Sequence, residues 1–207
     1  MLPEKIVYLA FLFHLVAYVF YFQSILKGHS KPNLVSWIIW TLAPFIAVFF
    51  QLKAGAGLVS IPTLLAGLGP LSVVIFYIFK KEAYWKLGMF DFICGALAMF
   101  ALVLYIFTHN LGISMLFAVL SDGLAAVPTI TKSWSFPDTE NVGPYLAGVF
   151  GNTLGLLIIT NWIFTIYAFS VYNILINVII IFCIYRKKIL PHIVAFFYGF
   201  FDVWPPK

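Results

Sequence analysis

Long apolar stretches separated by short cationic segments are the feature that most constrains how this chain can fold. Hydrophobic residues make up 63% of its 207 residues and charged residues only 9%, and the mean hydropathy is +1.04. Soluble domains usually carry about 25% charged residues, so this composition excludes a water-soluble globular protein. The chain is therefore expected to be an all-α integral membrane protein whose surroundings are the lipid bilayer.

A hydrocarbon core of about 30 Å requires about 20 apolar residues for each helical crossing. The apolar run from Tyr145 to Tyr185 is far too long for one helix, and it is divided at its only polar break, Thr160 and Asn161. Seven transmembrane helices are then predicted, at Ile6 to Leu26, Leu34 to Leu52, Leu58 to Phe79, Phe90 to Phe107, Leu111 to Thr131, Pro144 to Thr160 and Trp162 to Tyr185.

The basic residues give these helices an orientation. One side holds Lys5 and Lys53, and the other holds Lys27, Lys31, Lys80, Lys81, Lys86, Lys132, Arg186, Lys187, Lys188 and Lys207. Cytoplasmic loops carry the excess of Lys and Arg, so the N-terminus is expected outside and the C-terminus in the cytoplasm, with the plasma membrane as the location. This topology and the anionic headgroups explain the net charge of +5, so nucleic acid is not an expected partner.

Loop lengths group the helices as three, one and three. Residues 1–80 are expected to form a first three-helix unit, residues 81–110 a linker with an inverting fourth helix, and residues 111–188 a second three-helix unit. The tail, residues 189–207, is aromatic and too short to cross, so we expect it to lie along the cytoplasmic interface. The sequence leaves association into homo-oligomers open.

The two units correspond in the placement of features rather than in sequence identity. Asn33 precedes the second helix and Asn141 precedes the sixth, each after a short polar loop that contains a proline. Setting these asparagines in register aligns one face of each helix. The aligned positions are Trp37 with Tyr145, Trp40 with Gly148, and Pro44 with Asn152.

In these features the chain resembles the SWEET and PQ-loop transporter superfamily. That family is built from two parallel three-helix repeats joined by an inverting helix, and it carries a Pro-Gln pair near the cytoplasmic end of the first helix of each repeat. This chain keeps Gln23 without its proline, and Pro128 followed by threonine. The resemblance covers residues 6–185 in topology, and it implies a transporter of a sugar or similar small polar metabolite.

Asp122 is the first candidate for a functional role, because it stands about 15 Å from the cytoplasmic cations, counted along the fifth helix. A carboxylate at that depth is costly unless it is protonated, paired or beside water. His14 lies at a similar depth on the first helix, with Tyr18 on the same face. We expect these three residues to form a polar or proton-linked gate. The alternative is that Asp122 and His14 are packed, hydrogen-bonded structural groups.

The resemblance also implies a substrate pocket, because SWEET-like proteins line theirs with aromatic residues of each second helix and asparagines of each third helix. The positions carried over are Trp37, Trp40, Tyr145, Asn152, Asn173 and Asn177. The third helix of the first unit holds no asparagine, so a symmetric sugar clamp is incomplete. Interhelical hydrogen bonding is the alternative role for the asparagines.

Pro44 and Pro128 are predicted hinges, because proline removes a helical hydrogen bond, although prolines are also common in membrane helices. No motif predicts a cofactor, a bound metal or an enzyme, since a zinc-protease signature is absent and Asp122 is the single acid at mid-membrane depth. Transport of a small molecule by alternating access is the expected function. The alternative is a receptor, sorting or assembly protein of the same fold that binds a peptide or partner.

Overall fold

The computed structural model describes residues 3–81, 84–107 and 110–202. Within these ranges the chain is built from seven α-helices and short 3-10 turns, with no strand. The helices are α1 (Tyr8–Leu26), α2 (Leu34–Lys53), α3 (Ile61–Phe79), α4 (Met89–Ile106), α5 (Leu111–Ser135), α6 (Gly143–Leu157) and α7 (Phe164–Asp202). The 3-10 turns are η1 (Glu4–Val7), η2 (Gly57–Ser60) and η4 (Pro137–Thr139).

Five of these helical segments are long and apolar enough to cross a membrane. They are Glu4–Leu26, Leu34–Lys53, Gly57–Phe79, Leu111–Ser135 and Phe164–Leu190. The apolar part of α4, Met89–Phe100, is shorter, and α6 has only 15 residues. The prediction of an all-α protein suited to a membrane is therefore confirmed.

The helix boundaries follow the predicted ones closely except at the C-terminal end. α6 ends at Leu157 and α7 begins at Phe164, so the break predicted at Thr160 and Asn161 is present. α7 then continues to Asp202, through Pro191, whereas a separate tail was expected from residue 189. Lys188 is followed directly by Ile189 and Leu190 rather than by a glycine or a capping residue, and a proline removes only one helical hydrogen bond. Residues 203–207 of the predicted tail lie outside the described residues.

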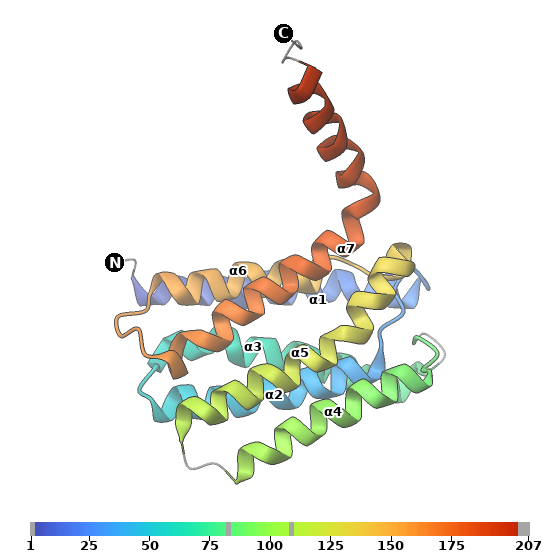
Figure 1. Ribbon diagram of the computed structural model, residues 1–207. Coiled ribbons are helices and arrows are strands. Elements are labelled where there is room, and N and C mark those ends of the chain that lie inside the picture. Colours follow the sequence, from blue (N-terminus) through green and yellow to red (C-terminus); the bar gives the residue numbers. More distant parts are fainter. Residues whose placement is uncertain (1–2, 82–83, 108–109, 203–207) are drawn as a thin grey trace.

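The helices pack in the same order in both halves of the chain (Figure 1). α3 contacts both α1 and α2, and α7 contacts both α5 and α6. Between the halves, α1 packs against α6 and α2 packs against α5. α4 lies at the outside of this arrangement, where it contacts α5 and α2.

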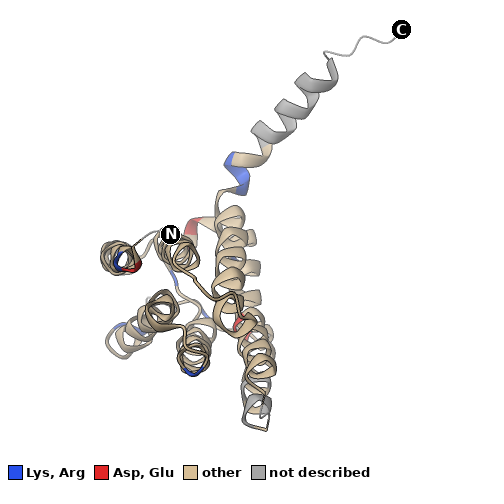
Figure 2. Cartoon of the chain, turned by 90° about the vertical axis from the view of Figure 1, so that its left-hand side faces the viewer, with Lys and Arg blue, Asp and Glu red and all other residues tan. Residues whose placement is uncertain are grey.

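The connections of the bundle alternate between two ends. The α1–α2, α3–α4 and α5–α6 connections lie at one end, which we call the basic end because it holds Lys27, Lys31, Lys80, Lys81 and Lys86 (Figure 1). The N-terminus lies at the opposite end, which we call the N-terminal end. Figure 2 looks along the helices from there, and tan, uncharged residues predominate along them. Most charged residues of the described chain stand in the connections or near helix ends, and Asp122, inside α5, is an exception.

Asn33 caps α2, and Asn141 lies just before α6, two helices that start at the basic end. The Asn33 side chain accepts hydrogen bonds from the backbone N–H groups of Val35 and Ser36, and donates to Asp91 on α4 at 2.6 Å. Before α6, the side chain of Asn141 accepts from the N–H of Gly143 at 2.8 Å. The two asparagines that relate the halves in sequence therefore both accept a hydrogen bond from the backbone N–H two residues later.

Side chains pack across both ends of the bundle. At the N-terminal end, the buried apolar cluster comprises Val7, Ala56, Val59, Ile158, Ile159 and Ile166. The largest buried cluster lies toward the basic end and is aromatic, with Tyr21, Trp37, Trp40 and Tyr145 among its members. Between these two layers lies the polar interior described next.

Candidate functional site

A cavity lies at the centre of the bundle, between the two halves of the chain. Its lining comes from α1, α2, α3, α5, α6 and α7, and α4 contributes none of the described lining residues. The cavity volume is about 50 Å³, which is room for a few water molecules. A metabolite of sugar size therefore requires the two halves to move apart.

One wall of the cavity is aromatic. Tyr18, Trp37, Trp40 and Tyr145 form a continuous series of rings from α1 through α2 to α6. Successive ring centroids are 6.4, 5.5 and 6.4 Å apart, and all three pairs meet edge to face. Such pairs hold one another in place, so this wall is rigid.

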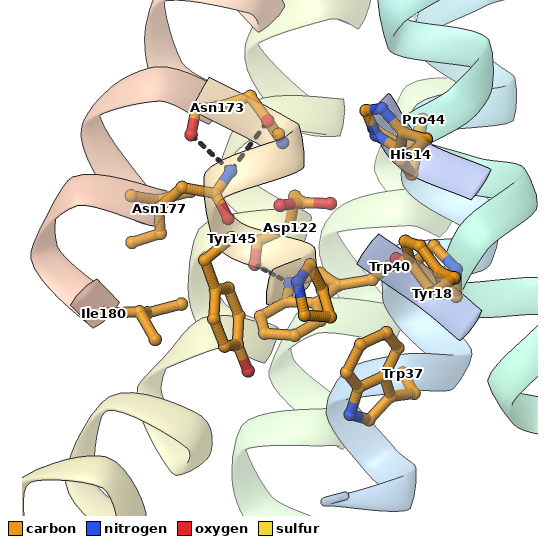
Figure 3. Close-up of a pocket in the computed structure, with 15 residues that line it drawn as sticks. His14, Tyr18, Trp37, Trp40, Pro44, Asp122, Tyr145, Asn173, Asn177 and Ile180 are labelled. Carbon is orange, nitrogen blue, oxygen red and sulfur yellow. Dashed lines mark hydrogen bonds between the residues drawn. The ribbon is translucent and has the colours of Figure 1, made fainter. Parts of the chain in front are cut away.

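The opposite wall is made of amides. The side-chain oxygen of Asn173 accepts hydrogen bonds from the amide nitrogens of Asn152, at 2.9 Å, and Asn177, at 2.8 Å. Figure 3 shows the bond from Asn177. Asn152 also donates to the backbone oxygen of Gly148, and Asn177 to that of Asn173. These bonds leave the amide nitrogen of Asn173 and the side-chain oxygen of Asn177 without a partner among the described residues. One amide NH2 group and one amide oxygen therefore remain available beside the cavity, and the side-chain oxygen of Asn152 is also without a partner among the described residues.

Gly148 makes this amide wall possible. A Cβ atom built on Gly148 would lie 2.6 Å from the amide nitrogen of Asn177 and 3.2 Å from the side-chain oxygen of Asn173. Any larger residue would displace both side chains. The equivalent position in the first half is Trp40, so the two halves use the same place for an indole ring and for a pair of asparagines.

The Asp122 carboxylate lies between the two walls. Figure 3 shows it with the asparagines on one side and the aromatic rings and His14 on the other. One carboxylate oxygen accepts a hydrogen bond from the hydroxyl of Tyr172 at 2.8 Å, and the residue is 2% exposed. The indole N–H of Trp40 donates to the backbone oxygen of Asp122 at 3.2 Å, which ties α2 to α5 beside the cavity. Among the described lining residues there is no lysine or arginine.

His14 reaches the cavity from α1. Its Nδ1 donates to the backbone oxygen of Ala10 at 3.0 Å, so Nε2 of the neutral ring is an acceptor. Its ring is stacked on Tyr18, with centroids 6.2 Å apart. A Cβ on Gly151 would lie 3.1 Å from the His14 ring, which shows how closely α6 approaches it.

Two prolines interrupt the hydrogen bonding of helices at the cavity. Pro44 and Pro70 both line it and lie inside α2 and α3. Each lacks the N–H that would bond the carbonyl four residues earlier, which belongs to Trp40 and Ala66, and these residues also line the cavity. The two prolines thus leave two carbonyls of lining residues without their usual helical donor.

The structure brings together most of the residues that were predicted to form a site. His14, Tyr18, Trp37, Trp40, Pro44, Asp122, Tyr145, Asn173 and Asn177 line the cavity, and Asn152 joins them through its bond to Asn173. Gln23 is exposed on α1, and Pro128 is buried inside α5 away from the lining.

Sequence reasoning missed Tyr172, which orients the Asp122 carboxylate, and Ala66 and Pro70, which complete the lining on α3. Tyr172 lies directly before Asn173 in an otherwise apolar run, so nothing in the pattern distinguishes it from a packing residue. Within the described residues, no group of three or more His, Cys, Asp or Glu side chains is placed to hold a metal ion.

Comparison with known proteins gives no match: no family model, curated protein or solved structure is similar to this chain. The functional argument therefore depends on the geometry of the cavity and on the relation between the two halves.

Proposed function

We propose that the chain is a multi-pass membrane transporter that moves a small polar molecule by alternating access. In this proposal α1–α3 and α5–α7 are the two moving three-helix units, α4 is the linker, and all seven helices cross the membrane. The observation that carries it is the central cavity, to which all six helices of the two units contribute and α4 does not. Transporters built from repeats hold their substrate at such an interface near the middle of the membrane.

The two units correspond in the placement of a titratable residue at this interface. His14 and Asp122 each stand 19 residues before the asparagine that caps or precedes the next helix, Asn33 or Asn141. Both line the cavity, from equivalent helices of the two units. Two related units around one central site are what the proposed rocking motion requires.

The relation extends to the basic end. Lys31 and Thr139 each lie two residues before those same asparagines, and the N–H of Lys31 donates to the carbonyl of Thr139 at 3.0 Å. Contact between equivalent residues is what a pseudo-two-fold relation between the two units predicts. This arrangement supports membership of the SWEET and PQ-loop superfamily, with the N-terminus outside and the basic end in the cytoplasm of a cell.

A test that requires no known substrate is the accessibility of the cavity from each side of the membrane. Ile176 lines the cavity, and its neighbour Leu175 is 59% exposed on the outer surface of α7. Ile176→Cys, in a chain whose Cys94 and Cys183 are changed to Ala, is treated with a charged, membrane-impermeant thiosulfonate. Both right-side-out and inside-out vesicles are used.

Alternating access predicts that Ile176→Cys reacts from both sides, because water reaches the cavity in each state. Leu175→Cys in the same background is the control, and it should react from neither side, since a thiol in lipid does not ionise. Reaction of Ile176→Cys from one side only would favour the receptor or assembly function over transport. Absence of reaction from both sides would exclude a water-accessible path.

A further inference from the structure

We infer that the solute held in the central cavity is a small organic cation, such as a primary or quaternary amine. The inference deepens the proposed transport function and rests on it for the role of the cavity. It replaces the sugar that the family resemblance implies with a solute chosen by the charge of the site.

The first argument is an unbalanced charge. Asp122 supplies a carboxylate, its described hydrogen bond is to the neutral hydroxyl of Tyr172, and no lysine or arginine is among the lining residues. In the described part of the chain the ion pair is elsewhere, between Lys132 and Glu140. A carboxylate at membrane depth is held by a counter-charge, a proton or water, and a cationic solute supplies the first.

The second argument is the surplus of acceptors. Pro44 and Pro70 lack the N–H groups that would bond the carbonyls of Trp40 and Ala66, and all four residues are among those that line the cavity. The side-chain oxygen of Asn177 is without a partner among the described residues, because the bonds within the amide wall use its nitrogen. An ammonium group has donors and no acceptor, so it matches these groups. The amide nitrogen of Asn173 is a donor group left without a partner beside these acceptors among the described residues.

The third argument is the aromatic wall. Tyr18, Trp37, Trp40 and Tyr145 bring four rings from three helices to the same cavity as the carboxylate. Cations bind to aromatic faces, most strongly to Trp, and this attraction increases when water is excluded. Aromatic rings of this kind form a common binding arrangement for quaternary amines.

The test is direct binding to the purified protein in detergent, followed by the fluorescence of its tryptophans. The probes are methylammonium, choline, glucose and 3,3-dimethylbutan-1-ol, the last of which has the shape of choline without its charge. Methylammonium is small enough for the cavity as it stands. We expect both cations to bind, and choline to bind at least 10-fold more tightly than its neutral isostere.

Asp122→Asn should reduce that preference to less than threefold, because it keeps the shape of the side chain and removes the charge. Asp91→Asn is the matched control, since Asp91 is a buried carboxylate that bonds Asn33 and Gly88 away from the cavity. It should leave the preference unchanged. Equal binding of choline and its isostere, tighter binding of glucose than of either cation, or binding of neither cation would overturn the inference.

These results are independent of the accessibility experiment on Ile176→Cys. Selective binding of cations with one-sided access would keep the ligand class and reject transport. Two-sided access without selective binding would keep transport and reject the cation. A preference for choline that survives in Asp122→Asn would reject the argument from charge, since Asp122 would then be a structural or proton-binding group that does not select the solute.

Discussion

The amino group of Lys132, at the end of α5, forms an ion pair with the carboxylate of Glu140, just before α6, and the two side chains are only 2% and 0% exposed. The same amino group donates to the backbone carbonyl of Lys31 between α1 and α2, and lies 5.5 Å from the ring centre of Trp85. The hydroxyl of Tyr145 donates to Glu140 at 3.1 Å. One buried cation thus joins the two units at the basic end and connects this contact to the wall of the cavity.

Removing one partner of the Lys132–Glu140 ion pair should lower the stability of the folded protein. Lys132→Met or Glu140→Gln leaves a buried charge without its counter-charge, and such losses are worth about 3–5 kcal/mol. The double variant, which removes both charges, should be more stable than either single variant. Thermal unfolding of the purified protein measures this, with the exposed Lys31→Met as a nearly neutral control. Strictly additive effects of the two single changes would contradict coupling between the charges.

The orientation of the chain predicts which lysines can be labelled from each side. Lys80, Lys81 and Lys86 are exposed at the basic end, and Lys53 is exposed at the N-terminal end. An impermeant amine reagent should modify the first three only in inside-out vesicles, and Lys53 only in intact cells, because positive loops remain in the cytoplasm. Peptide mass analysis identifies the labelled sites. Labelling of Lys80 in intact cells would reverse the orientation and remove the support for the family resemblance.

The amide wall should contribute to stability as well as to binding. Asn173→Leu preserves the size of the side chain but removes the acceptor that holds Asn152 and Asn177. We expect a loss of about 0.6 to 2 kcal/mol for each bond of this kind within a membrane protein, measured as a lower unfolding temperature. Ser170→Ala, one turn earlier on α7, is the matched control, since its buried hydroxyl has no hydrogen-bond partner among the described residues. A larger loss in Ser170→Ala than in Asn173→Leu would refute this role.

Sequence periodicity was sufficient to predict most of the fold, because the lengths of apolar runs are set by the membrane and their breaks by polar residues. The division at Thr160 and Asn161 and the correspondence of Asn33 with Asn141 both follow from this. The continuation of α7 past Lys188 does not, since neither a basic residue nor a single proline has to end a helix.

The site was less predictable, because its residues are joined by contacts across the bundle. A buried acid such as Asp122 is conspicuous in an apolar helix, whereas the tyrosine that orients it is one of eleven in the chain. The sequence placed Lys132 among the cytoplasmic cations, and the side chain instead turns inward to Glu140. Pairing of this kind depends on the packing of α5 against the α5–α6 connection, which periodicity does not determine.

The glycine of the amide wall gives a test of close packing. Gly148→Ala would place a Cβ atom 2.6 Å from the amide nitrogen of Asn177, so the asparagines must shift, at a cost of about 1–3 kcal/mol. Gly123→Ala on α5 is the control, because its Cβ would meet Tyr172 at an ordinary 3.6 Å and Ala favours a helix by about 1 kcal/mol. We expect Gly148→Ala to lower the unfolding temperature and to weaken choline binding, and Gly123→Ala to do neither. Equal behaviour of the two variants would show that the amide wall is loosely packed.

The last prediction concerns competition between protons and the bound solute at Asp122. The titratable groups around it on the cavity lining are His14 and Tyr18 from α1 and Tyr145 from α6, and Tyr172 on α7 donates to it. If a cation binds the ionised carboxylate, lowering the pH must weaken binding, because the proton and the cation occupy the same charge. Asp122→Asn should flatten this pH profile, whereas His14→Gln should shift it only if the two groups interact across the cavity. The affinity for choline, measured between pH 5 and pH 8, tests this competition. A pH dependence of choline binding that is the same in Asp122→Asn would show that Asp122 takes no part in it.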